Sequence, residues 1–481
     1  MSVSSPARSP LDLHGADFSA LMQDVVRFLG GFLDQLPTSS LMHPDASQRE
    51  PSAGLLARTL PAESGRSLPD LLQTISRAAS IGIETAGGVA LCGIPGTGLV
   101  SSAAADLIAG ILNRYMGVAI AAPGMIALEV SVLRWMADLM GMPPAAGGIL
   151  TSGGSMAHLS AILAARSTKL PEDFRRGRIY ATEETHHSLL KAARIAGFPQ
   201  DAVHIVPVDS QLRMKVGALR FAIARDRSAG RIPFCISANA GTTNTGTIDP
   251  LTQLAQVARD EGLWYHVDAA YGGFFQLTER GRQRLAGIEH ADSITLDPHK
   301  GLFVPFGTGC LLVRDAELLH RAHFFGHGAY LPDMGGFESG GVRLPDFSDL
   351  SPELTRPNRG LRLWLPLHLH GVAAFREALD DKLDLARALH RELRDIPQLH
   401  VLGEPDLSIV AFRCHDDLLT EQLVQYVNAV MPVNLLTTAI WGRRFVRVPI
   451  LNVRTTKEIL AGVVAAIREF ATQLERREIP A

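Results

Sequence analysis

The chain has 481 residues, of which 46% are hydrophobic, and its formal net charge is −3. Because single hydrophobic cores stop growing at roughly 250–300 residues, we expect one large domain with one or two smaller ones. The charge is small and no block of like charges occurs, which argues against a nucleic-acid or membrane-surface partner and favours a small-molecule ligand.

The N-terminal region predicts an arm rather than a domain of its own. It has no apolar segment followed by a cleavage site, so we expect no targeting signal. We expect a short apolar helix at residues 25–36, followed at residues 37–70 by a segment rich in Pro, Ser and Gly. This composition predicts an extended or loop-like arm that packs against a partner.

The next two parts of the chain show different patterns of apolar residues. Apolar residues recur at helical spacing from residue 99 to residue 140, interrupted by Pro123-Gly124, which predicts two helices joined by a turn. From residue 148 to residue 314, short β-rich segments alternate with helical ones, which predicts an α/β fold with a mostly parallel sheet covered by helices. The expected strands are residues 178–182, 204–208, 233–240, 264–270, 292–297 and 309–313.

Residues 326–359 are rich in Gly, Pro and Asp and too long for an ordinary connection. They predict a mobile active-site loop, the alternative being a loop without function. Beyond Leu361 the pattern predicts a smaller α+β domain. Its expected elements are a long helix, strands at 407–414 and 445–451, and a helix at 418–430. The predicted domains are an N-terminal arm (residues 1–98), a large domain (99–360) and a small C-terminal domain (361–481).

Two charged residues follow expected strands, which is where ligands bind in open α/β sheets. Lys300 stands in the segment DPHK, and a lysine near cationic or apolar groups can lose its proton and form a Schiff base with a carbonyl. Asp268 ends the strand WYHVD, where a buried acid needs a partner such as the protonated ring nitrogen of pyridoxal phosphate. Taken singly, the lysine is also compatible with an ordinary surface position and the aspartate with a helix cap.

Residues 151–155, TSGGS, lie between a strand and a helix and offer hydroxyl and backbone N–H groups at the helix N-terminus. That arrangement predicts a phosphate site, the alternative being a plain Gly-rich helix cap. The segment has neither the lysine of a nucleotide P-loop nor a dinucleotide fingerprint, so we do not expect a nucleotide.

His186 and His187 follow the strand expected at residues 178–182. An imidazole at this place can stack on an aromatic cofactor ring. A metal site is the weaker interpretation, because adjacent histidines on a helix point in different directions and no third ligand stands at a suitable spacing.

The four cysteines lie too far apart for a zinc site or a disulfide framework. They are Cys92, Cys235, Cys310 and Cys414. No run approaches the roughly 20 apolar residues of a membrane span. We therefore expect a cytoplasmic protein with reduced thiols, no metal and no membrane contact.

Taken together and in this order, the motifs TSGGS, His186, AGTTNTG (residues 240–246), HVDAAYGG (266–273) and DPHK resemble the group II pyridoxal-5′-phosphate-dependent amino-acid decarboxylases. The resemblance runs from Gly87 to Thr456. It implies the PLP-dependent transferase fold of type I, which is similar to aspartate aminotransferase. In that fold a large domain with a seven-stranded, mostly parallel sheet precedes a small α+β C-terminal domain. The resemblance also implies a homodimer with active sites at the interface.

The resemblance assigns roles to individual residues. Lys300 is expected to hold pyridoxal phosphate as a Schiff base, Asp268 to pair with its ring nitrogen, and His186 to stack on its ring opposite Ala270. Thr243 is expected near the ring and the substrate carboxylate. The residues expected to bind the cofactor are Gly153, Gly154, Ser155, His186, Thr243, Asp268, Ala270, Asp297, His299 and Lys300.

The chain departs from the family pattern in three places. Residues 87–95, GGVALCGIP, replace an aromatic-rich segment that lines the pocket of relatives, so an aromatic substrate is in doubt. An ungapped count places Phe347 where relatives have a catalytic loop tyrosine, and phenylalanine there is typical of aldehyde-forming relatives. Tyr330 is an alternative proton donor nearby. Asp297 stands where several relatives have asparagine, and the sequence offers no reason for it.

The resemblance implies decarboxylation of an L-amino acid to an amine and CO2, with the cofactor as electron sink. The alternatives are an aldehyde synthase that decarboxylates and deaminates, another lyase or an aminotransferase of the same fold, and a non-enzymatic relative. Retention of Lys300, Asp268 and His186 favours an enzyme. The sequence does not name the amino acid. Candidate contacts for an acidic substrate, or alternatively solvated loop residues, are Arg343, Arg356 and Arg359.

Overall fold

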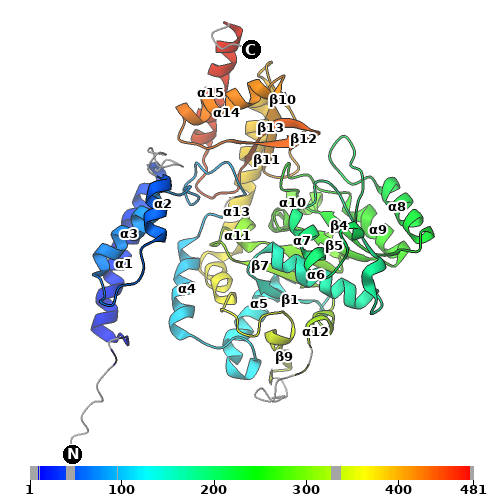
Figure 1. The fold of residues 1–481 in the computed structure, drawn as a ribbon, viewed down its shortest axis with the longest axis horizontal. Helices are drawn as coiled ribbons and strands as arrows, with labels where there is room; N and C mark the ends of the chain where they lie inside the picture. The colour runs from blue at the N-terminus through cyan, green and yellow to red at the C-terminus, as the bar shows by residue number, and fades with distance from the viewer. Residues whose placement is uncertain are drawn as a thin grey trace, which may run out of the picture.

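The computed structural model describes residues 9, 11–38, 49–94, 96–324, 326 and 337–476. Its centre is a seven-stranded sheet with the strand order β1-β7-β6-β5-β4-β2-β3 (Figure 1). The strands are β1 (Gly147–Thr151), β2 (Gly177–Ala181), β3 (Val203–Ile205), β4 (Ile232–Asn239), β5 (Trp264–Asp268), β6 (Ser293–Leu296) and β7 (Gly309–Val313). All pairs within β2 to β6 are parallel, whereas β7 runs antiparallel to β6 and β1. The predicted mostly parallel sheet is confirmed.

Helices cover both faces of this sheet. Every residue of β5, β6 and β7 is buried, as expected for strands with helices above and below them. The helices of this part are α5 (Pro123–Leu139), α6 (Gly154–Lys169), α7 (His187–Ile195), α8 (Val216–Ser228), α9 (Leu251–Glu261), α10 (Glu279–Arg284), α11 (Pro298–Gly301) and α12 (Glu317–His323). Short 3-10 helices are η3 (Ala119–Ala121), η4 (Phe174–Arg176), η5 (Gln200–Ala202), η6 (Gly273–Leu277) and η7 (Ile288–His290).

The two helices predicted between residues 99 and 140 are confirmed. α4 (Val100–Leu112) ends at Asn113, whose φ of 45° lies in the left-handed region that commonly ends a helix. α5 begins at Pro123, where the missing N–H costs nothing because the first helical N–H groups have no partner within the helix.

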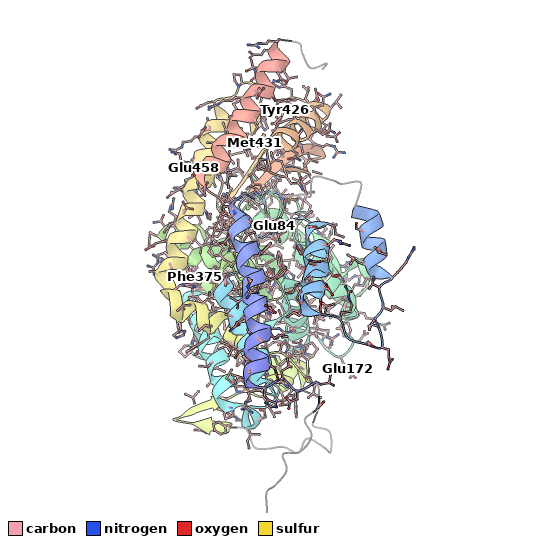
Figure 2. The ribbon with its side chains drawn as sticks, turned by 90° about the vertical axis from the view of Figure 1, so that its left-hand side faces the viewer. Glu84, Glu172, Phe375, Tyr426, Met431 and Glu458 are labelled. Atoms are coloured by element: carbon pink, nitrogen blue, oxygen red, sulfur yellow. The ribbon has the colours of Figure 1, made fainter. Side chains whose placement is uncertain are left out.

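Three further helices stand beside the body of the molecule at the N-terminus (Figure 1), and Figure 2 looks onto this side. They are α1 (Gly15–Gln35), α2 (Arg49–Ala57) and α3 (Leu68–Ser80), with the 3-10 helix η1 (Leu36–Thr38) after α1. No residue of α1 or α3 is buried within the chain. These helices therefore stand apart from the core.

The loop-like arm predicted at residues 37–70 is wrong for much of that segment. It contains α2 and the start of α3, while residues 39–48 lie outside the described part of the chain. Ser67 accepts a hydrogen bond from the N–H of Asp70, and Pro69 stands in the first turn of α3. Serine and proline here begin a helix, whereas their composition alone predicts a loop.

The C-terminal part forms a second, smaller sheet with its own apolar core. α13 (Gly360–Arg394) leads into it and is broken at Gly371, whose φ is 74°. The strand order is β10-β11-β13-β12, all antiparallel. The elements are β10 (His400–Val401), β11 (Ile409–Arg413), α14 (Asp417–Val430), β12 (Leu436–Ile440), β13 (Arg443–Pro449) and α15 (Lys457–Glu475). No helix in the described ranges is long and apolar enough to span a bilayer.

The predicted mobile loop at residues 326–359 is only partly described, since residues 327–336 fall outside the described ranges. Its second half contains the hairpin of β8 (Phe337–Ser339) and β9 (Val342–Leu344) and the 3-10 helix η8 (Phe347–Asp349). The side chains of Leu344, Phe347 and Leu350 are buried in the main core. The part from Leu344 to Leu350 is therefore packed against the core, whereas the tip of the hairpin is exposed.

Candidate active site

A cavity of about 280 Å³ opens where β4, β5 and β6 end. This is the edge of the sheet at which α/β proteins bind their ligands. The structure brings all ten predicted cofactor-binding residues to this one cavity. They are Gly153, Gly154, Ser155, His186, Thr243, Asp268, Ala270, Asp297, His299 and Lys300.

Lys300 reaches the cavity from α11, directly beyond β6. Its Nζ lies 2.8 Å from Oδ2 of Asp297, three residues earlier. Oδ1 of Asp297 is buried and has no hydrogen-bond partner in the described part of the chain. Asp297 therefore contacts the amine of Lys300 with one oxygen and keeps the other as an unused acceptor. The contact with Lys300 is a structural role for this aspartate that the sequence did not indicate.

Asp268 ends β5 at the floor of the cavity and is held by both oxygens. Oδ1 accepts the backbone N–H of Ala270 at 3.1 Å, and Oδ2 lies 3.3 Å from Nε2 of His158. Burial alone would raise the pKa of Asp268, but His158, Lys300 and the N–H of Ala270 together hold that pKa below its ordinary value. The carboxylate is thus kept ionised, as a partner for a positive group.

His186 precedes α7 and faces the cavity with an uncharged ring. Its Nδ1 lies 2.6 Å from the hydroxyl of Ser188. Burial lowers the pKa of His186, and the nearby Asp268 offsets this only in part. A neutral, flat imidazole suits contact with an aromatic ring better than a hydrated cation does.

The predicted phosphate site is a tight turn between β1 and α6. Gly153 has a φ of 153°, and the N–H groups of the first turn of α6 have no partner within the helix. His299 borders this turn, and its Nδ1 donates to the carbonyl of Thr308 at 2.7 Å. Burial lowers the pKa of His299, which favours the neutral ring, and its Nε2 lies 3.8 Å from Oδ2 of Asp297.

These residues fit pyridoxal phosphate. The cofactor needs an amine for its aldehyde, an anion for its ring nitrogen and donors for its phosphate. Lys300, Asp268 and the start of α6 supply these groups around one space. No group of three His, Cys, Asp or Glu suited to a metal occurs in the ranges that the structure describes.

Several other lining residues had no role assigned by the sequence prediction. They are His158, Glu184, Ser188, Asn239, Gly241, Thr242 and Tyr271. Of these, Glu184 and Ser188 belong to the same short segment as His186, so their place in the site could have been inferred. Burial raises the pKa of Glu184, whose carboxylate accepts from Asn244 at 3.3 Å. His158 lies inside an apolar helix pattern and gave no signal.

Other expected site residues do not meet the cavity. Phe347 is fully buried in the core, with the guanidinium of Arg356 4.4 Å from its ring centre. Arg356 pairs with Glu129 at 2.6 Å, and Arg359 pairs with Glu353 at 2.7 Å. Neither arginine is solvated or turned toward a substrate. Tyr330 lies outside the described residues.

The chain is similar to known proteins over most of its length. A model of the pyridoxal-dependent decarboxylase conserved domain matches residues 65–415. The aromatic-L-amino-acid decarboxylase of Bacillus atrophaeus is 34% identical over 390 residues, covering 79% of this chain and 80% of that protein. The L-2,4-diaminobutyrate decarboxylase of Rhizobium meliloti (strain 1021) is 32% identical over 388 residues, covering 78% and 76% respectively.

A solved structure agrees with the fold. The crystal structure of Oryza sativa TDC with PLP and tryptamine superimposes with a TM-score of 0.88. The match covers 97% of this chain and 100% of that one, at 24% sequence identity. At this identity the likeness concerns the fold alone, and the fold-type prediction made from the motifs is confirmed.

Proposed function

The chain belongs to the pyridoxal-dependent decarboxylase family and uses pyridoxal phosphate to decarboxylate an amino acid, and from this premise we propose that the cavity around Lys300 is its active site. The observation that carries the proposal is that an amine, an ionised acid, a neutral imidazole and a phosphate-type turn line one cavity. The proposed reaction yields CO2 and the amine of an L-amino acid.

The proposed roles follow from the contacts of each residue. When bound, pyridoxal phosphate supplies an electron-withdrawing ring that accepts the electron pair released as CO2 leaves. Lys300 provides the amine that binds the cofactor, and Asp297 orients this amine. Asp268, kept ionised by its neighbours, holds a proton on the ring nitrogen. Ser155 and the N-terminus of α6 bind the phosphate, and His186 covers the ring.

The reaction is tested by mixing the purified protein, loaded with pyridoxal phosphate, with a panel of L-amino acids. The panel includes the aromatic amino acids and 2,4-diaminobutyrate, because relatives carry those names. We expect CO2 and an equal amount of amine. Aldehyde with ammonia and peroxide would instead favour the aldehyde synthase, an alternative that gains nothing from Phe347, which is buried away from the cavity.

Replacement of Lys300 tests the site itself. We expect Lys300→Ala to lose the visible absorption of the bound cofactor and all turnover, because the chain then lacks the amine that binds the aldehyde. Lys191→Ala, which removes an exposed lysine of α7, is the matched control and is expected to match the wild type. Normal turnover in Lys300→Ala would contradict the assignment.

We also propose a homodimer, because α1, α3 and α4 carry apolar side chains that nothing in the described part of the chain covers. Exposed examples are Val26 in α1 (63% exposed), Ile75 in α3 (53%) and Ile111 in α4 (58%). Apolar faces of this kind mark interfaces. A cytoplasmic location is a further proposal, supported by the four cysteines, which are all unpaired.

A further inference from the structure

His158 connects two groups that face the cavity from different elements. It lies in α6, is 1% exposed, and its two ring nitrogens point to different partners. Nδ1 lies 2.8 Å from the hydroxyl of Ser188, and Nε2 lies 3.3 Å from Oδ2 of Asp268. Because Ser188 also contacts His186, an unbroken chain of contacts runs from His186 through Ser188 and His158 to Asp268.

The hydrogens of this chain can be counted. The hydroxyl of Ser188 has one hydrogen and lies between two ring nitrogens, so it donates to one of them and accepts from the other. The backbone N–H of Ser188 also donates to Nδ1 of His186 at 3.4 Å, so that nitrogen carries no hydrogen. The hydroxyl of Ser188 therefore donates to His186 and accepts from Nδ1 of His158.

This direction places His158 between two elements. Its Nδ1 donates to Ser188 at the start of α7, and its Nε2 lies 3.3 Å from Oδ2 of Asp268 at the end of β5. The ring of His158 is thus held by Ser188 on one side and stands against the carboxylate of Asp268 on the other.

The other titratable groups around His158 do not replace it. His266 of β5 meets it edge-on with the ring centres 5.4 Å apart, and burial lowers the pKa of His266 to about 3, so it stays neutral. Lys300 of α11 acts on Asp268 and on His186 through charge alone. His158 is thus the group that joins Asp268 to α7 by direct contact.

We propose that His158 is a positioning residue, which fixes the carboxylate of Asp268 and, through Ser188, the ring of His186. The proposal rests on the proposed function, since Asp268 and His186 touch the cofactor only if it binds in this cavity. Its consequence is that a change at His158 alters both the surroundings of the cofactor's ring nitrogen and the position of the imidazole that covers the ring.

Two uncharged substitutions separate the two contacts of His158. The amide of His158→Gln reaches the position of Nε2 and can donate to Asp268, whereas the shorter amide of His158→Asn reaches only the position of Nδ1 and Ser188. Ser160→Ala is the control, because Ser160 is buried in the same helix and its hydroxyl has no partner in the described part of the chain.

The readouts are the dissociation constant of pyridoxal phosphate and the visible absorption of the bound cofactor as a function of pH. We expect His158→Asn to bind the cofactor about tenfold more weakly, which corresponds to a rise of one pKa unit at Asp268, and to shift the absorption curve along the pH axis. We expect His158→Gln to stay within about threefold of the wild type. Ser160→Ala is expected to leave both readouts unchanged.

Equal losses in His158→Asn and His158→Gln with an unshifted absorption curve, or no loss in either, would assign His158 to packing and overturn the proposal. If His158→Asn does not fold, Ser188→Ala breaks the same chain, and an unshifted absorption curve in that variant would overturn it as well. Failure of the proposed function is a separate result, namely wild-type protein that does not bind pyridoxal phosphate or releases no CO2.

Discussion

At the scale of single residues, the polar groups below the cavity determine how the protein responds to acid. His266 is completely buried, its Nδ1 lies 2.8 Å from the hydroxyl of Ser293, and Trp264 donates to the same hydroxyl. Burial lowers the pKa of His266 from 6.5 to about 3. Below pH 6.5 the unfolded chain therefore takes up a proton at this residue that the folded chain does not.

This difference gives a prediction with a definite sign. The folded pKa is depressed, so the stabilisation is complete above pH 6.5 and is lost as the pH falls toward 3. We expect His266→Asn to reduce the loss of unfolding free energy between pH 7 and pH 5 by about 2 kcal/mol relative to the wild type. Urea unfolding at the two pH values measures this, and parallel behaviour of the two proteins would contradict it.

The residues of the site could be predicted where a reactive or charged side chain stands at the end of a predicted strand. Asp268 ends β5, Lys300 follows β6 and His186 follows β2, and the carboxyl ends of strands are where α/β sheets bind their ligands. His158 could not be predicted, because a single histidine in an apolar helix is typically a core residue and its contact with Asp268 exists only once β5 packs against α6. Phe347 was assigned to the site by an ungapped count of loop residues, and such a count does not show whether a side chain is buried in the core.

At the scale of elements, the phosphate turn depends on close contact between β7 and the start of α6. Gly309 opens β7, and a side chain there would overlap the backbone of Gly153. We expect Gly309→Ala to displace the first turn of α6 and weaken pyridoxal phosphate binding at least about tenfold, because backbone N–H groups act only at hydrogen-bond distance. Gly217→Ala in α8, where the space around the glycine is open, is the control.

Titration of the apoprotein with pyridoxal phosphate measures the effect. An unchanged dissociation constant in Gly309→Ala, with a folded protein, would show that the turn can move without affecting the phosphate site. The thermal midpoint should be recorded alongside, since Gly217→Ala is expected to keep or raise it through its better helix propensity.

The strands and helices of the two sheets could be predicted because the apolar pattern within a short segment is enough to show which of its side chains are buried. Each strand expected from residue 178 onward is present, since a run of apolar residues between helices has few other ways to be buried. The arm at residues 37–70 was wrong because Ser67, Pro69 and Asp70 suit both a loop and the first turn of a helix. The apolar residues that follow them distinguish the helix from the loop, and a prediction from composition does not take their spacing into account.

At the scale of the whole molecule, the two sheets are joined through a buried carboxylate. Asp406 precedes β11 and accepts from Arg213 at 3.1 Å, while Arg284 lies 3.3 Å from it and the N–H of Ile248 donates at 3.1 Å. We expect Asp406→Ala to destabilise the protein by about 2 kcal/mol, because the N–H of Ile248 and two partly exposed guanidinium groups lose their shared acceptor.

Thermal unfolding and limited proteolysis measure this prediction, with cleavage near residues 395–408 as the expected sign of a loosened junction. Asp395→Ala, which removes an exposed carboxylate at the end of α13, is the control. Equal midpoints in the two variants would mean that the packing around Tyr271 and Ser408 holds the junction by itself. The predicted domain boundary at residue 361 stays a prediction, and it falls in the first turn of α13.

The proposed dimer belongs to this scale too. We expect Val26→Asp, Ile75→Asp and Ile111→Asp, combined in one variant, to convert the protein to monomers, because three charges would enter an apolar interface. Size-exclusion chromatography with light scattering measures the mass. Phe221 is 70% exposed and belongs to α8, which lies on the other side of the molecule from α1 and α3 (Figure 1), so Phe221→Asp should leave the mass of the wild type unchanged. A wild-type monomer would contradict the proposal.

The position of β1 in the sheet has a consequence for the order of events during synthesis. β1 pairs with β7, which follows it by more than a hundred and fifty residues, and β7 pairs with β6. Long-range pairings of this kind form late, because the intervening chain must first be closed into a loop. The turn after β1 and the lysine after β6 therefore come together only after residue 313 has left the ribosome. A nascent chain shorter than this cannot capture its cofactor, however well its earlier half is folded.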